Sequence, residues 1–336
     1  MERYINSFST ENDIQIALEN GELLKPYVAY IEDADRIDWN SKTKTDNKNK
    51  YLTFNITSNG NINVPTGTTY SINGAEWENT GRTITVNSGE TIRFKGNNST
   101  YNNNTFSGST ASFEVEGNIM SLIYGDDFKN KLTISSNNTF ANLFKNCTKL
   151  VSAENLILPA TTLKNFCYYY MFAGCTSLTV APELPATTLA QYCYGSMFQG
   201  CTSLATAPAL PANTLAQFCY MNMFQSCTSL TTAPVLPANT LAPYCYSTMF
   251  NGCTSLTTAP ELPATTLAES CYMNMFNGCT KLKYIKCLAT NISATNCTSY
   301  WAYSVSSTGT FVKNPNMTNW TTGKNGIPEG WTVQDA

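Results

Sequence analysis

The stretch LPATTLAQYCYGSMFQGCTSLATAP, residues 184–208, decides the fold, because close copies of it follow one another along the chain. The next two copies are LPANTLAQFCYMNMFQSCTSLTTAP (210–234) and LPANTLAPYCYSTMFNGCTSLTTAP (236–260). More divergent copies lie on either side, at 158–182 and 262–286, so the chain is built from 26-residue repeats. One such unit cannot bury its own apolar face, so the repeat predicts a stack of units that stabilise one another.

Each copy predicts a short helix followed by a short strand. Leu189, Cys193, Met197 and Cys201 fall four residues apart, which would lay one apolar stripe along a helix. A glycine after the Met-Phe pair would end this helix in the left-handed conformation, and Ser226 replaces that glycine in one copy. The Thr-Ser-Leu segment that follows is predicted to be a strand, kept short by the next proline. The expected helix N-caps, most with a Gln or Glu three residues later to complete a capping box, are Thr162, Thr188, Thr214, Thr240 and Thr266.

The repeat has the size of a leucine-rich repeat, a class with periods of roughly 20 to 29 residues. Its unit MF-x-GCTSL-x-x-AP-x-LPA-x-TL resembles the BspA-like leucine-rich repeat proteins of gut Bacteroidetes and their phages, over roughly residues 137–310. The resemblance implies an α/β leucine-rich-repeat solenoid of 26-residue repeats over residues 134–310. Residues 311–336 resemble the segment that closes such arrays, and a cap is what an open apolar end requires.

Residues 51–133 predict a small all-β sandwich. Alternating apolar and polar residues occur at Leu52–Ile56, Thr83–Val86 and Thr91–Phe94, separated by Gly, Asn and Ser. A period of two with regular turn residues is typical of antiparallel strands. The segment also resembles the β-domain that commonly precedes these repeats, which implies a fold and no chemistry.

Residues 1–50 predict a short α+β segment that is too small for a core of its own. We expect it to dock on a partner and to gain order there. The string from Tyr30 to Asn40 resembles the N-terminal segments of virion structural proteins in crAss-like phages. Within it, Asp33, Asp35 and Asp38 lack the glycine and closing glutamate of a calcium loop, so a solvated turn is expected. The apolar residues expected to make the docking contact are Ile5, Ile14, Leu18, Tyr30 and Trp39.

Composition argues against an enzyme and against a nucleic-acid binder. Charged residues make up only 13% of the chain, the formal net charge is −3, and there is no histidine, the commonest general base and metal ligand. Glu183 and Glu261 are three repeats apart and make no acid/base pair. We therefore expect no catalytic, cofactor or metal site and no nucleic-acid partner. No stretch has the length of a membrane span or the pattern of a secretory signal, so we expect no membrane insertion.

The 13 cysteines occupy repeat positions. In a helix, the two cysteines of one unit would be about 12 Å apart, beyond the reach of a disulfide. Without histidine or a C-x2-C motif, a zinc site is poorly supported as well. Buried, reduced thiols are the expectation.

Two rows of repeat residues are candidates for a binding surface. Tyr194, Tyr220 and Tyr246 could form a platform for sugar rings, although packing between repeats is the favoured interpretation because each lies four residues before a phenylalanine. The second candidate row consists of Thr206, Thr232 and Thr258.

The sequence thus predicts a non-enzymatic phage virion structural protein. Residues 1–50 would attach to other proteins of the capsid or tail, and the repeats would face a host surface protein or glycan. The sequence leaves homo-oligomerisation open. The alternative is a BspA-like adhesin on the bacterial cell surface, which the lack of a recognisable signal makes the second choice.

Overall fold

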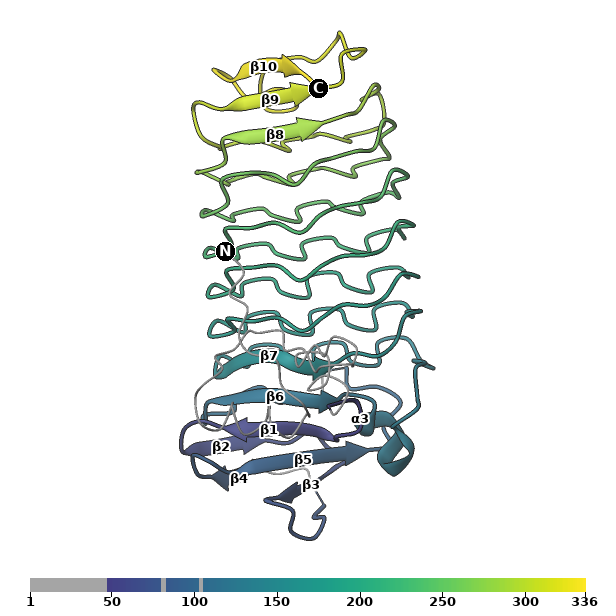
Figure 1. Ribbon diagram of the computed structural model, residues 1–336, viewed down its shortest axis with the longest axis vertical. Helices are drawn as coiled ribbons and strands as arrows, with labels where there is room; N and C mark the ends of the chain where they lie inside the picture. The colour runs from purple at the N-terminus through teal and green to yellow at the C-terminus, as the bar shows by residue number, and fades with distance from the viewer. Residues whose placement is uncertain (1–46, 80–82, 103–104) are drawn as a thin grey trace, which may run out of the picture.

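The computed structural model describes residues 47–336, apart from 80–82 and 103–104. The chain forms a β-rich fold in which a sheet at one end continues into a stack of coils, and a second small sheet lies at the other end (Figure 1). Parallel bridges join equivalent residues of successive coils, as in Thr188↔Thr214 and Thr214↔Thr240. The residues predicted to dock on a partner, Ile5, Ile14, Leu18, Tyr30 and Trp39, lie outside the described residues, as do Asp33, Asp35 and Asp38.

The first sheet has the strand order β3-β5-β1-β6-β7, and β2 and β4 form a separate pair. The strands β3, β5, β1 and β6 pair antiparallel, and the three strands expected from the alternating pattern are present as β1, β4 and β5. β7 directly precedes the first 26-residue copy and pairs parallel with β6, so the sheet continues into the stack. The bounds are β1 (Leu52–Ile56), β2 (Gly60–Asn63), β3 (Thr68–Ile72), β4 (Thr83–Val86), β5 (Thr91–Gly96), β6 (Phe113–Asn118), α3 (Ser121–Tyr124), the 3-10 helix η1 (Gly125–Asp127) and β7 (Leu150–Ile157).

The helices expected in the repeats are absent. No helix occurs in residues 134–336, all of which the structure describes. In the unit around Phe172, every second amide closes a turn with the carbonyl three residues earlier, as in Met171 N to Tyr168 O at 3.1 Å. The amides between them donate to the next coil, as in Phe172 N to Met197 O at 2.9 Å. Half of the amides that a helix would use within itself therefore join one coil to the next.

The turns require a left-handed residue at every fourth position. Phe166, Tyr170 and Gly174 have φ values of 57°, 55° and 74°, and the equivalent residues of later coils repeat this pattern. Asparagine and glycine tolerate this conformation best, and they occupy many of these positions. Examples are Asn138, Asn142, Asn146, Asn222, Asn274, Gly200, Gly252 and Gly278.

The error in the helix prediction has a specific cause. The residues of the turn segments mostly alternate in pairs, two buried and two facing outward, as in Cys167 and Tyr168 followed by Tyr169 and Tyr170. This period of four resembles the spacing of a helical stripe, so Cys193, Met197 and Cys201 are buried as predicted although no helix is present. The residues at the left-handed positions are poor helix formers and mark the turns instead.

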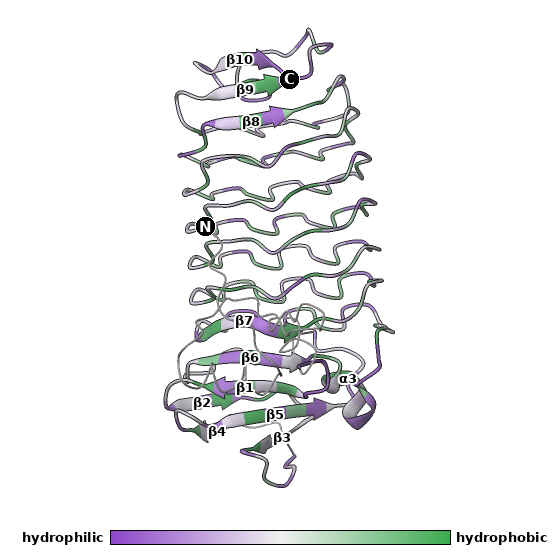
Figure 2. Cartoon of the chain, in the orientation of Figure 1, coloured by the Kyte–Doolittle hydropathy of each residue, from purple (hydrophilic) through white to green (hydrophobic). Residues whose placement is uncertain are grey.

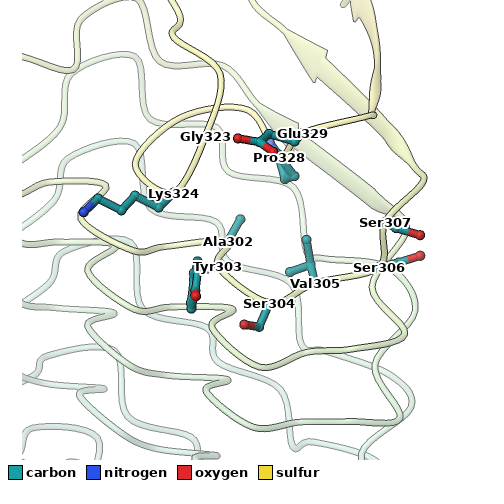
Figure 3. A pocket seen from close by; sticks show the side chains of 10 residues that line it. All are labelled: Ala302, Tyr303, Ser304, Val305, Ser306, Ser307, Gly323, Lys324, Pro328 and Glu329. Carbon is teal, nitrogen blue, oxygen red and sulfur yellow. The ribbon is translucent and has the colours of Figure 1, made fainter.

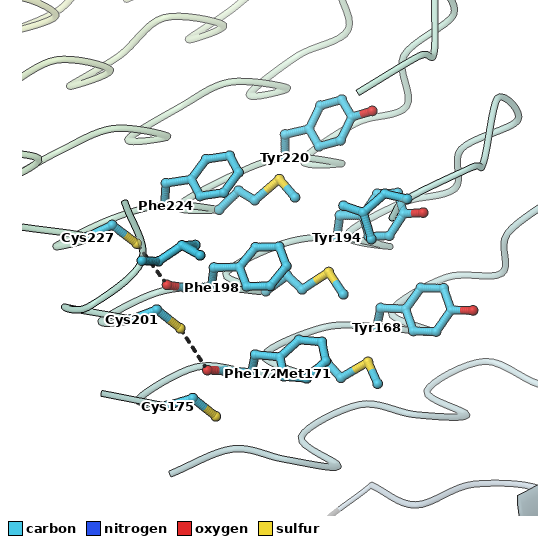
Figure 4. Packing of buried hydrophobic residues seen from close by; sticks show 14 of the residues in the cluster. Tyr168, Met171, Phe172, Cys175, Tyr194, Phe198, Cys201, Tyr220, Phe224 and Cys227 are labelled. Atoms are coloured by element: carbon cyan, nitrogen blue, oxygen red, sulfur yellow. Dashed lines mark hydrogen bonds between the residues drawn. The ribbon is translucent and has the colours of Figure 1, made fainter. Parts of the chain in front are cut away.

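The core of the stack consists of rows of identical side chains. Phe172, Phe198 and Phe224 are fully buried, and their ring centroids are 5.5 and 5.7 Å apart with nearly parallel planes (Figure 4). Phe144 extends this row to Phe54 in β1, at a centroid distance of 6.0 Å. One hydrophobic cluster consequently runs from the first sheet through all the coils.

The C-terminal residues close the far end of the stack. β8 (Tyr284–Cys287), β9 (Thr310–Lys313) and β10 (Thr332–Asp335) form a parallel sheet in the order β10-β9-β8. The central residues of β9 are buried and apolar, whereas β10 is exposed along its whole length and is polar except for Val333 (Figure 2). Trp301 stacks on Trp320 at 5.5 Å and covers the last aromatic row. A polar outer strand ends a stack that would otherwise expose its core.

Ser226 offers a test of the turn geometry. Its φ is 60°, whereas glycine stands at the same position as Gly174, Gly200, Gly252 and Gly278. A side chain in the left-handed region is strained, so Ser226→Gly is expected to raise the free energy of unfolding by up to ~1 kcal/mol, measured by urea denaturation.

The matched control is Ser229→Gly, three residues away. Ser229 is also exposed, and its φ is not positive. Glycine at this position only adds conformational freedom to the unfolded chain. The free energy of unfolding of the control is therefore expected to fall by about 0.5 kcal/mol or more. Equal effects of the two substitutions would contradict the left-handed turn at Ser226.

Candidate binding face

The outward positions of the turn segments form one surface, which we call the turn face. It consists of the rows that begin at Asn165, Phe166, Tyr169, Tyr170, Ala173 and Gly174 and continue at the equivalent positions of later coils, although Ala173, Ser196, Ser247 and Ser270 in these rows are buried. Each row is fixed by the backbone bonds between coils, which hold equivalent residues about one strand spacing apart, roughly 4.8 Å. The face is therefore a regular array rather than a set of independent loops.

Four aromatic side chains of this face form a continuous half-buried stack, which we call the aromatic ladder. Phe166, Tyr192, Phe218 and Tyr244 have centroid distances of 4.7, 4.4 and 4.7 Å between successive rings. All four have positive φ, which is rare for bulky residues, so the turn geometry and not the local preference sets their orientation. Burial raises the pKa of Tyr192, so its hydroxyl stays neutral to a higher pH than that of a free tyrosine.

The aromatic ladder is widest at its first coil. Tyr169 contacts Phe166 and Tyr192 edge-on, at 5.5 and 5.7 Å. Gly195 makes room for Tyr169, because a Cβ at that position would lie 3.0 Å from the ring. At the far end of the same face, Tyr300 and Tyr303 are exposed by 40% and 51%.

Amide side chains flank the aromatic ladder on both sides. The Gln191 amide donates to the Gln217 carbonyl oxygen at 3.4 Å, in the row directly beside the rings. On the other side, Gln199 donates to Gln225 at 2.5 Å, and Gln225 donates to Asn251 at 3.5 Å. These bonds run along the rows and orient the amides in the same direction from coil to coil.

The turn face is almost free of charge. Residues 165–280 contain no lysine, arginine or histidine, and Glu269 is the acidic residue on the outward rows. Its carboxylate accepts a hydrogen bond from the Tyr244 hydroxyl at 3.2 Å. Cations occur only toward the ends, where Lys145 lies over the Tyr170 ring and Lys324 over the Tyr300 ring.

The tyrosines proposed from the sequence are not part of this face. Tyr194, Tyr220 and Tyr246 are at most 2% exposed and stack on one another inside the core, at 6.0 and 5.8 Å. Figure 4 shows the first two of them beside Tyr168. Their assignment as surface-binding residues is therefore wrong, and the favoured packing interpretation is confirmed. Desolvation by burial raises their pKa values well above the usual value of tyrosine.

The proposed threonines lie on another segment of each coil. Thr206, Thr232 and Thr258 are exposed, and Thr206 pairs with Thr232 through a parallel bridge. They form a row as predicted, but it lies just before the Leu-Pro-Ala segment, whose leucine and alanine are buried, and not on the turn segments that carry the aromatic ladder. Whether this row binds anything stays a prediction.

The cysteines are free and buried, as predicted. In five coils the thiol donates to a phenylalanine carbonyl of the preceding coil, for example Cys201 to Phe172 O at 3.1 Å (Figure 4). Each of these five thiols thus links two coils and is removed from solvent. Among the described residues, no group of three or more Cys, Asp or Glu could hold a metal ion.

A shallow cleft of about 500 Å³ lies next to the C-terminal cap (Figure 3). Its lining includes Tyr303, Ser304, Lys324 and Glu329. Lys324 Nζ donates to the Tyr300 hydroxyl at 3.0 Å, and this bond raises the pKa of the lysine. A second cleft of about 490 Å³ lies beside α3, where Asp126 accepts bonds from Lys95 and from the Tyr51 hydroxyl. Both clefts are small and open, and neither belongs to the aromatic ladder.

Within the described part of the chain, no helix has the length and hydropathy needed to cross a bilayer. A scan of protein-family models found no match to the chain, and searches of curated proteins and of solved structures found none either.

Proposed function

We propose that this chain is a non-enzymatic structural protein of a phage virion, attached through residues 1–50 and displaying the stack of coils to a host surface protein or glycan. The proposal places the stack among BspA-like leucine-rich repeats, in a form whose helical segment is replaced by turns. The 26-residue period and the buried leucine of each unit, such as Leu204 and Leu230, support this placement.

The observation that carries the display function is the division between a sealed core and a repeated surface. One hydrophobic cluster joins all the coils, and the reactive thiols lie inside it. The outward rows carry uncharged residues over most of the stack, and one of them holds an aromatic ring in four successive coils, at Phe166, Tyr192, Phe218 and Tyr244. An elongated scaffold with an extended, repeating surface is typical of binding proteins built from repeats.

The virion assignment rests on the string from Tyr30 to Asn40, which resembles the N-terminal segments of virion structural proteins. Residues 1–50 carry apolar side chains in a segment too short for an independent core. Such a segment is suited to docking, while the rest of the chain buries its own apolar residues.

Deleting residues 1–45 tests the attachment. The truncated protein is expected to fold with an unchanged thermal midpoint but to be missing from purified phage particles, measured by mass spectrometry. A finer variant, Tyr30→Ala with Trp39→Ala in the full chain, is expected to reduce the copy number in particles. Truncated protein at the wild-type copy number in particles would show that residues 46–336 contain the attachment site. Full-length protein on the bacterial cell surface and absent from particles would favour the adhesin alternative.

A further inference from the structure

We propose that the turn face binds a neutral glycan chain lying along the axis of the stack, with the aromatic ladder and its flanking amides as the contact surface. The inference rests on the proposed display function and adds to it a defined site and one class of ligand.

The aromatic ladder presents ring edges to the ligand. Each inner ring is covered on both faces by its neighbours, since Tyr192 lies between Phe166 and Phe218 at 4.7 and 4.4 Å with nearly parallel planes. The half-exposed part of such a ring is therefore its edge, where the C–H groups carry partial positive charge. Hydroxyl and ether oxygens of a sugar are suitable partners for that edge.

The amide rows supply hydrogen bonds of both kinds. A glutamine side chain offers two N–H donors and a carbonyl acceptor, which matches hydroxyl groups that both donate and accept. Gln199, Gln225 and Asn251 already use bonds within their row, which fixes the orientation of the amides. A surface ordered in advance loses less conformational entropy when a ligand binds.

The charge pattern selects a neutral ligand. No cation occurs between Lys164 and Lys281, so an acidic polysaccharide would find no counter-charge over most of the ladder. The carboxylate on the outward rows, Glu269, is held by the Tyr244 hydroxyl at 3.2 Å. Burying an unpaired charge against this face would be unfavourable.

The repeat of the face favours a polymer over a protein surface. A ring recurs in four successive coils about 4.8 Å apart, and an amide stands beside it in three of them, at Asn165, Gln191 and Gln217. This spacing is close to the length of one sugar unit. A glycan of identical units can meet the ring and the amide of these three coils in the same way. A folded protein partner presents no such repeat, and its binding usually depends on a few side chains anchored in pockets.

The experiment is affinity electrophoresis of the full chain in gels that contain dextran, mannan or arabinoxylan, with polygalacturonate as the anionic counterpart. The wild-type protein is expected to be retarded by at least one neutral polysaccharide. The variant Tyr192→Ser with Phe218→Ser is expected to bind roughly tenfold more weakly. Serine is a natural occupant of this position, because Ser270 takes the place of the aromatic residue in the next coil with a φ of 50°.

Three further variants separate binding from folding. The exchange Tyr192→Phe with Phe218→Tyr keeps the ladder and is expected to retain binding. Gln191→Ala with Gln217→Ala leaves the rings in place and is expected to weaken binding several-fold. Thr206→Ala with Thr232→Ala alters the other exposed row and is expected to have no effect.

The outcomes distinguish this inference from the proposed function. Retardation that survives the serine variant, or that is lost in the threonine variant, would overturn the site while leaving glycan display intact. Retardation by polygalacturonate alone, or by none of the polysaccharides, would overturn the neutral-glycan assignment. Neither result bears on incorporation into particles, which is measured separately.

Discussion

Raising the pH from 8 to about 10.5 is expected to unfold the chain. Burial raises the pKa of many thiols in the core from the usual value of 9.0, and for several of them to about 12. The cysteines with this shift are Cys193, Cys245, Cys279 and Cys287.

The direction of the effect follows from which state ionises first. Above pH 9 the thiols of the unfolded chain lose their protons, whereas the buried thiols of the folded chain keep them. Stability from this source is complete below pH 9 and is lost as the pH rises toward 12. Above pH 9, each such thiol lowers the free energy of unfolding by about 1.4 kcal/mol per pH unit. The four together therefore lower it by about 6 kcal/mol per unit. A typical folded protein is stable by only about 5 to 15 kcal/mol.

Urea denaturation from pH 7 to 10.5 measures this loss. The urea concentration at the unfolding midpoint is expected to stay constant to pH 8.5 and to fall steeply above pH 9. The control variant Cys245→Ala removes one titrating thiol and is expected to reduce the slope above pH 9 by about 1.4 kcal/mol per unit. Alkylation supplies a second check, since native protein at pH 8 should react slowly and denatured, unreduced protein should reveal 13 free thiols. An unchanged midpoint at pH 10.5, or stable intramolecular disulfides, would contradict the sealed core.

The repeat period, the buried cysteines and three strands of the first sheet could be predicted from the sequence. Each depends on a pattern that burial imposes directly, such as the alternation in Leu52–Ile56. The conformation of the repeat could not be predicted from the apolar spacing, because a helix and a series of turns both bury residues four apart. Asparagine and glycine at positions such as Asn222 and Gly252 were the signal for turns.

The turn face was missed for a related reason. A helical interpretation directs attention to the tyrosine after each cysteine, yet Tyr220 is buried and Phe218, the residue before the cysteine, faces outward. The alternation of Phe and Tyr at 166, 192, 218 and 244 is visible in the sequence. This alternation indicates a surface row only if the residues form turns that place them in pairs, two buried and then two outward. That arrangement follows from the backbone and not from the apolar spacing.

The close approach of neighbouring coils on the turn face predicts that a disulfide can join them. Gln199 and Gln225 occupy equivalent positions, and their backbones are joined through bonds such as Gly200 N to Gln225 O at 2.8 Å. Their Cα atoms should therefore be about 4.8 Å apart, which is within the reach of a disulfide. The axes of packed helices would instead lie about 8 to ~10 Å apart, which is beyond that reach.

The double variant Gln199→Cys with Gln225→Cys tests this arrangement, and with it the turn face on which the proposed binding depends. The control is Gln199→Cys with Asn251→Cys, whose residues lie two coils apart and should remain unbridged. After mild oxidation, mass spectrometry of the digested protein is expected to find the 199–225 disulfide in nearly every molecule. Two free thiols at these positions in folded, oxidised protein would contradict the stack of turns and would support the helical interpretation of the repeat.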